Sequence, residues 1–248
     1  MCVPVPESRD GVPYGAPGAR AHRRRYHPTA GVSSLLQNAS SPKLYTYGYD
    51  ALRLPAKVYM LVTGPAGSGK STLATSIALT LALQGLRVLC ISAEEGAGPT
   101  TVRRLRQAMA WLGDPCLPSS NPLISDKRAL RDVHDEVVAF ERDGGDAVVL
   151  DSLTVLGASP QWVAEVATGL SVVAISHMNG KSGPMGGERV AYDSDVHIRV
   201  ESFQASLLKT RWCVDGAPRS WPVDDVWVAK KQSFNEVIPF PSRPRMGS

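Results

Sequence analysis

From about residue 58 onward, the chain alternates short apolar runs with longer amphipathic segments. The runs are rich in Val, Ile and Leu, which is typical of strands buried on both faces of a parallel sheet. Because amphipathic segments separate the runs, the pattern predicts βαβ units. The predicted strands are Val58–Thr63, Arg87–Ser92, Ala147–Asp151 and Ser171–Ser176.

Helices are predicted where apolar residues recur every three or four positions. The first predicted helix spans Lys70 to Leu83, and Gly85 stops it. The apolar stripes are Leu73, Ile77 and Leu81 in this helix, Val102, Leu105, Met109 and Leu112 in the second, and Leu130, Val133 and Val137 in the third.

The helical pattern stops after residue 194, and shorter β-rich runs follow. They lie at Val196–Val200, Ala205–Thr210 and Val226–Ala229. We expect these runs to finish the sheet, partly as antiparallel hairpins. The predicted fold is therefore α/β, with a mostly parallel central sheet flanked by helices and antiparallel strands at the C-terminal end.

A chain of 248 residues suits one α/β domain with short extensions. We place a basic arm rich in Pro and Gly at 1–44, the domain at 45–231 and a tail at 232–248. No apolar run reaches the ~20 residues that a membrane helix needs, and the N-terminal residues lack the apolar stretch of a secretory signal. We therefore expect a cytoplasmic protein without a membrane partner, and we interpret its four scattered cysteines as structural.

The net charge of +4 originates in the N-terminal part of the chain. Residues 1–57 hold eight of the 27 Lys and Arg residues but only three of the 23 Asp and Glu residues. Three arginines and one tyrosine lie in the cluster His22–His27. This arm either holds nucleic-acid phosphates or is a solvated, flexible segment with no assigned partner.

The segment Gly-Pro-Ala-Gly-Ser-Gly-Lys-Ser at 64–71 matches the phosphate-binding pattern G-x-x-x-x-G-K-[ST], between a predicted strand and a predicted helix. Glycines let backbone N–H groups converge on phosphate oxygens, and the positive end of the helix adds to the attraction. We expect Lys70 to neutralise the β- and γ-phosphates of ATP and the Ser71 hydroxyl to coordinate Mg²⁺. The predicted nucleotide-binding residues are Gly64, Pro65, Ala66, Gly67, Ser68, Gly69, Lys70, Ser71 and Thr72.

Two further carboxylates follow predicted strands, where ligands bind in open α/β sheets. Asp151 ends an apolar run, and we predict that it supports Mg²⁺ as the Walker B aspartate, although Asp is also common as a turn or cap residue. Glu94 and Glu95 follow the second strand, where the base or orienter of the attacking water belongs. Because successive side chains of an extended chain alternate, we predict that only Glu94 faces the site. The alternative is that the pair caps the next helix.

These motifs, in this order, resemble the RecA-like branch of P-loop ATPases, most closely the RadA/Sms type, over about residues 45 to 225. Ser92–Gly96 stands where that family has Ser-Gly-Glu-Glu-Ser, Asp151–Ser152 matches its Asp-Ser, and Ser176–His177 stands where it has Gly-His. DnaB-type and RepA-type hexameric helicases share the same core. The resemblance implies a RecA-like fold and ATP hydrolysis at the subunit interfaces of a homo-oligomer, either a hexameric ring or a filament.

The resemblance also suggests roles for His177 and the loop that follows it. In RecA-like motors a residue at this place senses the γ-phosphate, whereas a polar residue here could also be a satisfied core histidine. The family's glycine-rich loop, which contacts single-stranded DNA, is similar to residues 178–190, with Gly187-Glu188-Arg189 in place of Gly-Pro-Arg. Lys181 and Arg189 are the predicted DNA-binding residues, although composition alone favours a flexible surface loop.

Lys209-Thr210-Arg211-Trp212 is similar to the family's Lys-Asn-Arg-Phe-Gly motif. Residues i and i+2 of a strand share a face, so Lys209 and Arg211 can reach one target together. The resemblance implies that this target is the ATP of a neighbouring subunit. The alternative is a basic strand edge that discourages pairing with other chains.

Three classes of function are consistent with these features. The first is a DNA-dependent ATPase of recombination or repair, working with ATP, Mg²⁺ and single-stranded DNA. The second is a replicative or plasmid-type hexameric helicase. The third is a KaiC-like regulatory ATPase that binds proteins instead of DNA.

Overall fold

The computed structural model describes residues 43–112, 121–178, 188–212 and 219–223. Several predictions concern residues outside these ranges: most of the arm 1–44, Cys2, Cys116, Cys213, Lys181 with most of its loop, the strand Val226–Ala229 and the tail 232–248.

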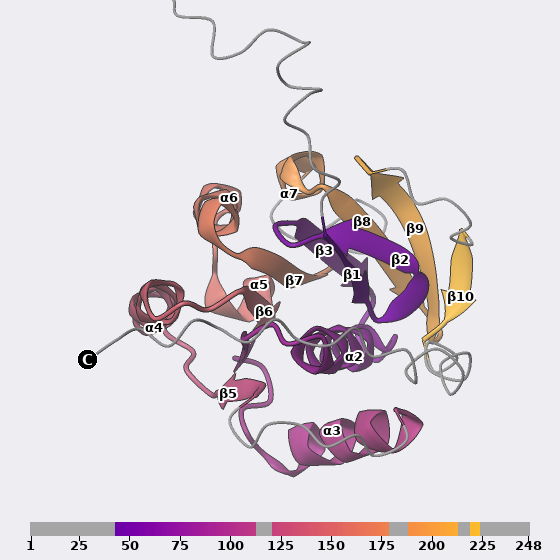
Figure 1. Cartoon of the computed structure of the whole chain (residues 1–248), viewed down its shortest axis with the longest axis horizontal. Helices are drawn as coiled ribbons and strands as arrows, with labels where there is room; N and C mark the ends of the chain where they lie inside the picture. The colour runs from indigo at the N-terminus through magenta and orange to yellow at the C-terminus, as the bar shows by residue number, and fades with distance from the viewer. Residues whose placement is uncertain (1–42, 113–120, 179–187, 213–218, 224–248) are drawn as a thin grey trace, which may run out of the picture. The chain divides into compact units, whose positions relative to one another are not determined.

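A central sheet and a separate hairpin make up the β structure of the described residues (Figure 1). The hairpin consists of β1 (Leu44–Tyr47) and β2 (Tyr49–Pro55). The sheet consists of β3 (Tyr59–Gly64), β4 (Val88–Ser92), β5 (Leu123–Ser125), β6 (Ala147–Asp151), β7 (Ser171–His177), β8 (Val196–Glu201), β9 (Gln204–Thr210) and β10 (Ser220–Pro222).

The strand order of the sheet is β10-β9-β8-β3-β7-β6-β4-β5. All neighbours from β8 to β5 pair in parallel, whereas β8 with β9 and β9 with β10 pair antiparallel. The predicted α/β class, with a mostly parallel sheet and antiparallel strands at its C-terminal end, is thereby confirmed. Every residue of β3 and β6 is buried, which explains their continuous apolar runs.

Helices cover both faces of the sheet. They are α2 (Lys70–Leu83), α3 (Pro99–Trp111), α4 (Leu130–Arg142), α5 (Leu153–Leu156), α6 (Pro160–Gly169) and α7 (Glu188–Asp193). One core cluster joins α2 and the β1–β2 hairpin to one face. The other cluster joins α4, α5, α6 and α7 to the opposite face. Alternate residues of each strand supply the two clusters: Met60 and Val62 of β3 pack on the first, and Tyr59 and Leu61 on the second.

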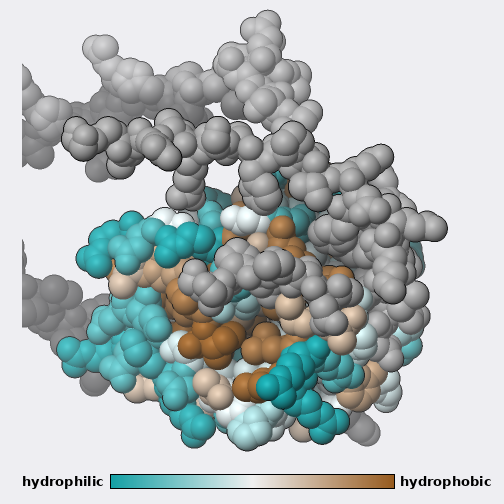
Figure 2. Space-filling model, turned by 60° about the horizontal axis from the view of Figure 1, so that its bottom comes forward, coloured by the Kyte–Doolittle hydropathy of each residue, from teal (hydrophilic) through white to brown (hydrophobic). Residues whose placement is uncertain are grey.

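The helix predicted from the stripe that contains Val102 is present as α3, but not every apolar residue of the stripe is buried. Val102 is 41% exposed, and the buried residues of the helix are Thr101 and Ala108. Because α3 packs against α2, only its inward side is covered. Figure 2 turns the bottom of Figure 1, where α3 and β5 lie, toward the viewer and shows hydrophobic residues near the centre of that face, bordered by hydrophilic ones.

The β1–β2 hairpin was not predicted from the sequence pattern. Its backbone is held by Gln84, just after α2, whose Oε1 accepts from the Thr46 N–H at 2.8 Å while its Nε2 donates to the Thr46 carbonyl at 2.9 Å. The Tyr47 hydroxyl, fully buried, lies 2.8 Å from Oγ of Ser171 at the start of β7. The helices within the described residues are too short or too polar to span a bilayer.

Candidate nucleotide site

The turn from β3 to α2 brings backbone unusually close to other parts of the chain. Gly64 has φ 155°, and a Cβ there would lie 2.0 Å from the Val200 carbonyl oxygen of β8. Gly69 has φ 101°, a value that L side chains rarely adopt. Only glycine therefore fits this path, which leads directly from the end of β3 into the start of α2.

The start of α2 offers unsatisfied backbone donors together with one buried cation. Its N-cap is Gly69, and no side chain caps the helix. Lys70 is 5% exposed, and its Nζ donates to the Pro65 carbonyl at 2.7 Å, which folds the ammonium back over the loop. Burial lowers the pKa of Lys70, opposed by the charges of Glu94 and Asp151. Uncapped amides and a cation at one turn suit the binding of phosphate.

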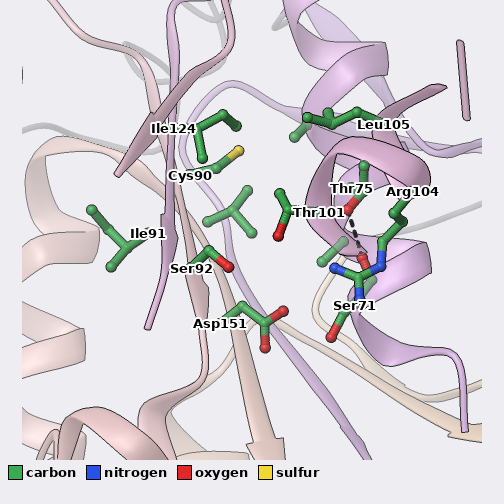
Figure 3. Close-up of a pocket in the computed structure, with 13 residues that line it drawn as sticks. Ser71, Thr75, Cys90, Ile91, Ser92, Thr101, Arg104, Leu105, Ile124 and Asp151 are labelled. Atoms are coloured by element: carbon green, nitrogen blue, oxygen red, sulfur yellow. Dashed lines mark hydrogen bonds between the residues drawn. The ribbon is translucent and has the colours of Figure 1, made fainter. Parts of the chain in front are cut away.

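Asp151 ends β6 with its carboxylate directed at the same place. It is 8% exposed, and burial raises its pKa, against the lowering effects of the Ser71 hydroxyl and the Arg104 guanidinium. Ser71, Arg104 and Asp151 line one small cavity between α2, α3 and the sheet (Figure 3). Burial makes the charged form of this carboxylate unfavourable. A divalent cation bound to the carboxylate and the neighbouring hydroxyl would offset that cost.

Two buried oxygen atoms of this region have no hydrogen-bond partner among the described residues: Asp151 Oδ1 and Ser68 Oγ. Buried polar atoms without partners are rare, and they point to an ion or ligand. A carboxylate and a hydroxyl oxygen are the ligand types that Mg²⁺ prefers. The residues present thus fit MgATP, with Ser71 and Asp151 near the ion and the 64–71 turn around the phosphates.

Glu94 lies just beyond β4 and pairs with the predicted sensor residue. The N–H groups of Ala93 and Glu94 donate to the Asp151 carbonyl at 2.7 and 3.2 Å, which holds this segment against the end of β6. Glu94 Oε2 is 3.0 Å from His177 Nε2 at the end of β7. The His177 N–H also donates to Thr154 Oγ1 at 3.2 Å. Glu94 and His177 are thus brought together by two strands that are not adjacent in sequence.

Glu95 is directed elsewhere, into an ion pair that sequence reasoning did not find. Both of its carboxylate oxygens accept from Arg104 Nη2, at 2.9 and 2.8 Å. Arg104 projects from α3, and its side chain is 14% exposed. The two adjacent carboxylates therefore have different partners, although Glu94 and Glu95 lie in a turn and not in the extended chain that the alternation argument assumed. A basic residue on the next helix was the only sequence signal for this partner.

The strand order explains why these groups converge. The 64–71 turn follows β3, His177 ends β7, Asp151 ends β6 and Glu94 follows β4, and these four strands are consecutive neighbours in the sheet. Their carboxyl ends meet at one edge, which is where open α/β sheets bind ligands.

Lys209 and Arg211 share a target, as expected for positions i and i+2. Lys209 Nζ donates to the Ala191 and Tyr192 carbonyls at 2.9 and 2.6 Å, and Arg211 Nη2 donates to the Tyr192 carbonyl at 3.0 Å. Both cations thus lie at the negative C-terminal end of α7. Arg211 also lies 3.4 Å from Asp195 Oδ1.

Arg189 is the one predicted DNA-binding residue that lies within the described ranges. Its side chain projects from α7, is 73% exposed and lies 3.5 Å from Asp193 Oδ2. Such an exposed i,i+4 pair contributes little to stability. The guanidinium is therefore available to an anionic partner.

The sequence profile of the family described as an AAA domain matches residues 27–183, more than half of the chain. The chain belongs to the AAA domain family. The AAA-domain protein is also similar to the solved structure of another protein's ATPase domain, at 14% sequence identity and a TM-score of 0.53, covering 76% of this chain and 90% of that one. No curated protein matches the sequence.

These comparisons support a RecA-like P-loop ATPase and thereby the predicted binding of nucleotide. The likeness to the solved ATPase domain shows the fold alone at this identity. The closer resemblance of the AAA-domain protein to the RadA/Sms type stays a prediction, as do the roles of the individual site residues.

Proposed function

We propose that this AAA-domain protein hydrolyses ATP within a homo-oligomer, a ring or filament, and couples hydrolysis to contact with single-stranded DNA. The observation that carries the proposal is the convergence of Lys70, Asp151, Glu94 and His177 at the ends of four neighbouring parallel strands. This edge supplies a phosphate cradle, a metal ligand and a carboxylate for the attacking water, which are the parts that phosphoryl transfer to water needs.

Within this site each residue has a separate task. Lys70 and the amides at the start of α2 hold the phosphates, and Ser71 and Asp151 hold Mg²⁺. A Mg²⁺ ion held by these two residues would supply positive charge to the phosphates. Glu94, whose side chain lies at this edge and is 43% exposed, orients the attacking water and accepts its proton.

His177 connects this chemistry to the proposed DNA contact. It touches Glu94 through its ring, and residues 178–190 follow it directly in the chain. A change in the Glu94 contact when the γ-phosphate leaves would therefore bias the segment that carries Lys181 and Arg189.

ATPase rate measured with and without single-stranded DNA tests the proposed function. We expect the rate to rise when single-stranded DNA is added. An unchanged rate at saturating DNA would contradict the DNA-dependent function and favour a KaiC-like regulatory ATPase. Unwinding of a forked duplex by the isolated protein would instead favour the helicase.

DNA affinity of the Arg189→Ala variant is expected to depend less on salt than that of the wild type. Each phosphate contact on a single strand contributes a slope of about −0.7 in log K against log salt, because counterions are released. Fluorescence anisotropy of a labelled oligonucleotide between low and high salt measures the change, and Lys181→Ala should lower the slope by the same amount.

Arg142→Ala is the matched control, since Arg142 is 77% exposed on α4. Its slope should equal that of the wild type. If the Lys181→Ala/Arg189→Ala double variant binds normally while deletion of residues 1–30 abolishes binding, the DNA site lies on the basic arm instead.

A further inference from the structure

The tip of the β8–β9 hairpin is fixed directly onto the phosphate-binding turn. The Phe203 N–H donates to the Ser68 carbonyl at 3.0 Å, and the Phe203 carbonyl accepts from the Val223 N–H at 2.7 Å. Nearby, the Val200 carbonyl approaches Gly64 so closely that any Cβ there would collide with it. Phe203 therefore takes its position from the turn itself.

The backbone at this tip adopts a conformation that favours glycine. Ser202 has φ 48° and Phe203 has φ 59°, although neither is glycine. Positive φ at a bulky residue persists only where surrounding contacts hold it, and such residues cluster at functional sites. The hydrogen bonds to Ser68 and Val223 supply these contacts.

The Phe203 ring lies against the turn with part of its surface open. A Cβ at Gly69 would lie 2.9 Å from Cδ1 of this ring, yet Phe203 remains 50% exposed. Packing in the core of the domain thus leaves half of a large apolar residue uncovered. The ring contacts Gly69, which immediately precedes the proposed phosphate-binding helix.

We propose that Phe203 is a stacking platform for the base of the bound nucleoside triphosphate, an inference that rests on the proposed ATP site. Nucleotide whose phosphates lie in the 64–71 turn carries its base at only the length of a ribose from them. An aromatic ring in contact with Gly69 is within that reach. Stacking on a flat aromatic surface is favourable for any base, because every base has a π-face.

Because the proposed contact is with the base, loss of the Phe203 ring should weaken the binding of nucleotides but not the binding of a polyphosphate without a base. Calorimetric titration of the full chain with MgATP and, separately, with magnesium tripolyphosphate measures both affinities. Phe203→Ala is expected to weaken MgATP binding roughly 10-fold, within the range found for one base stacked on an aromatic ring. Tripolyphosphate affinity should stay as in the wild type, because the turn still holds the phosphates.

The variants Phe203→Leu and Phe203→Trp distinguish stacking on the base from structural support of the turn. Leucine retains bulk against Gly69 without a π-face and should also bind MgATP more weakly, whereas tryptophan should restore the affinity. MgGTP should follow MgATP in every variant, since stacking does not read base identity. Leu208→Ala is the matched control, because Leu208 is 54% exposed on β9, the strand that begins directly after Phe203.

Each other outcome overturns the platform. Equal losses of MgATP and tripolyphosphate affinity would mean that Phe203 only supports the turn. Unchanged MgATP affinity in Phe203→Ala and Phe203→Leu would place the base elsewhere and leave the proposed function standing. If the wild type binds neither MgATP nor tripolyphosphate, the proposed function fails and the platform fails with it.

Discussion

Glu94→Gln is expected to bind MgATP like the wild type and to lose turnover by about 10²–10⁴-fold, the usual contribution of a positioned general base. A base is needed only for the chemical step, so kcat falls while binding is retained. Glutamine retains the shape of the side chain and the possibility of contact with His177, 3.0 Å away, but it cannot accept the proton of the water. Single-turnover hydrolysis and nucleotide titration separate the two effects.

Glu95→Gln is the matched control, because Glu95 is the adjacent carboxylate and is engaged by Arg104. Its turnover should stay within a few-fold of the wild type, since a partly exposed ion pair contributes about 0–1 kcal/mol. The Lys70→Ala variant, in contrast, should lose nucleotide binding itself, which precedes the chemical step. Normal hydrolysis by Glu94→Gln together with inactive Glu95→Gln would reverse the assignment of the two glutamates.

The strands and the phosphate-binding turn could be predicted because their signals are local. Residues buried on both faces produce continuous apolar runs, and β6 begins and ends at the residues predicted for it. The helix Lys70–Leu83 likewise has the predicted bounds. The hydrophobic pattern of such a segment can be recognised without knowledge of the residues that pack against it.

Other features depend on contacts between distant segments and left no readable pattern. Val102 belongs to the apolar stripe that predicts α3, but which residues of α3 are buried depends on where α2 lies. The partner of Glu95 is a residue on another helix, and the approach of Phe203 to Gly69 joins positions that are far apart in the sequence. Sequence motifs could thus identify the candidate residues, but the direction in which each side chain points could be determined only from the folded structure.

Arg211→Ala is expected to lower ATP turnover by about 10³–10⁵-fold, the effect of an arginine supplied to a phosphoryl transfer by a neighbouring subunit. Within one chain, Arg211 and Lys209 lie on the carbonyl groups at the end of α7, and the Arg211 side chain is 51% exposed. A carbonyl end carries about half a negative charge. The γ-phosphate of a neighbour, with more charge, would compete for the exposed guanidinium.

Arg199→Ala is the matched control, because Arg199 lies on the adjacent strand β8, is 41% exposed and is paired with Glu201. It should hydrolyse ATP at nearly the wild-type rate. If Arg211 only makes a basic strand edge, the two variants should behave alike, since an exposed ion pair contributes about 0–1 kcal/mol. Comparison of the two rates therefore separates a catalytic contribution from a general effect of surface charge.

Mixing distinguishes action on a neighbour from action within one chain. Arg211→Ala and Lys70→Ala proteins should each be inactive alone, but a mixed assembly contains interfaces with an intact Lys70 on one side and an intact Arg211 on the other. We expect ATPase activity to return on mixing, once exchange of labelled subunits between assemblies has been verified by energy transfer. Near-normal turnover by Arg211→Ala alone would remove Arg211 from the reaction. Activity that stays absent despite exchange would mean either that Arg211 acts in its own subunit's site or that the subunits must fire in concert.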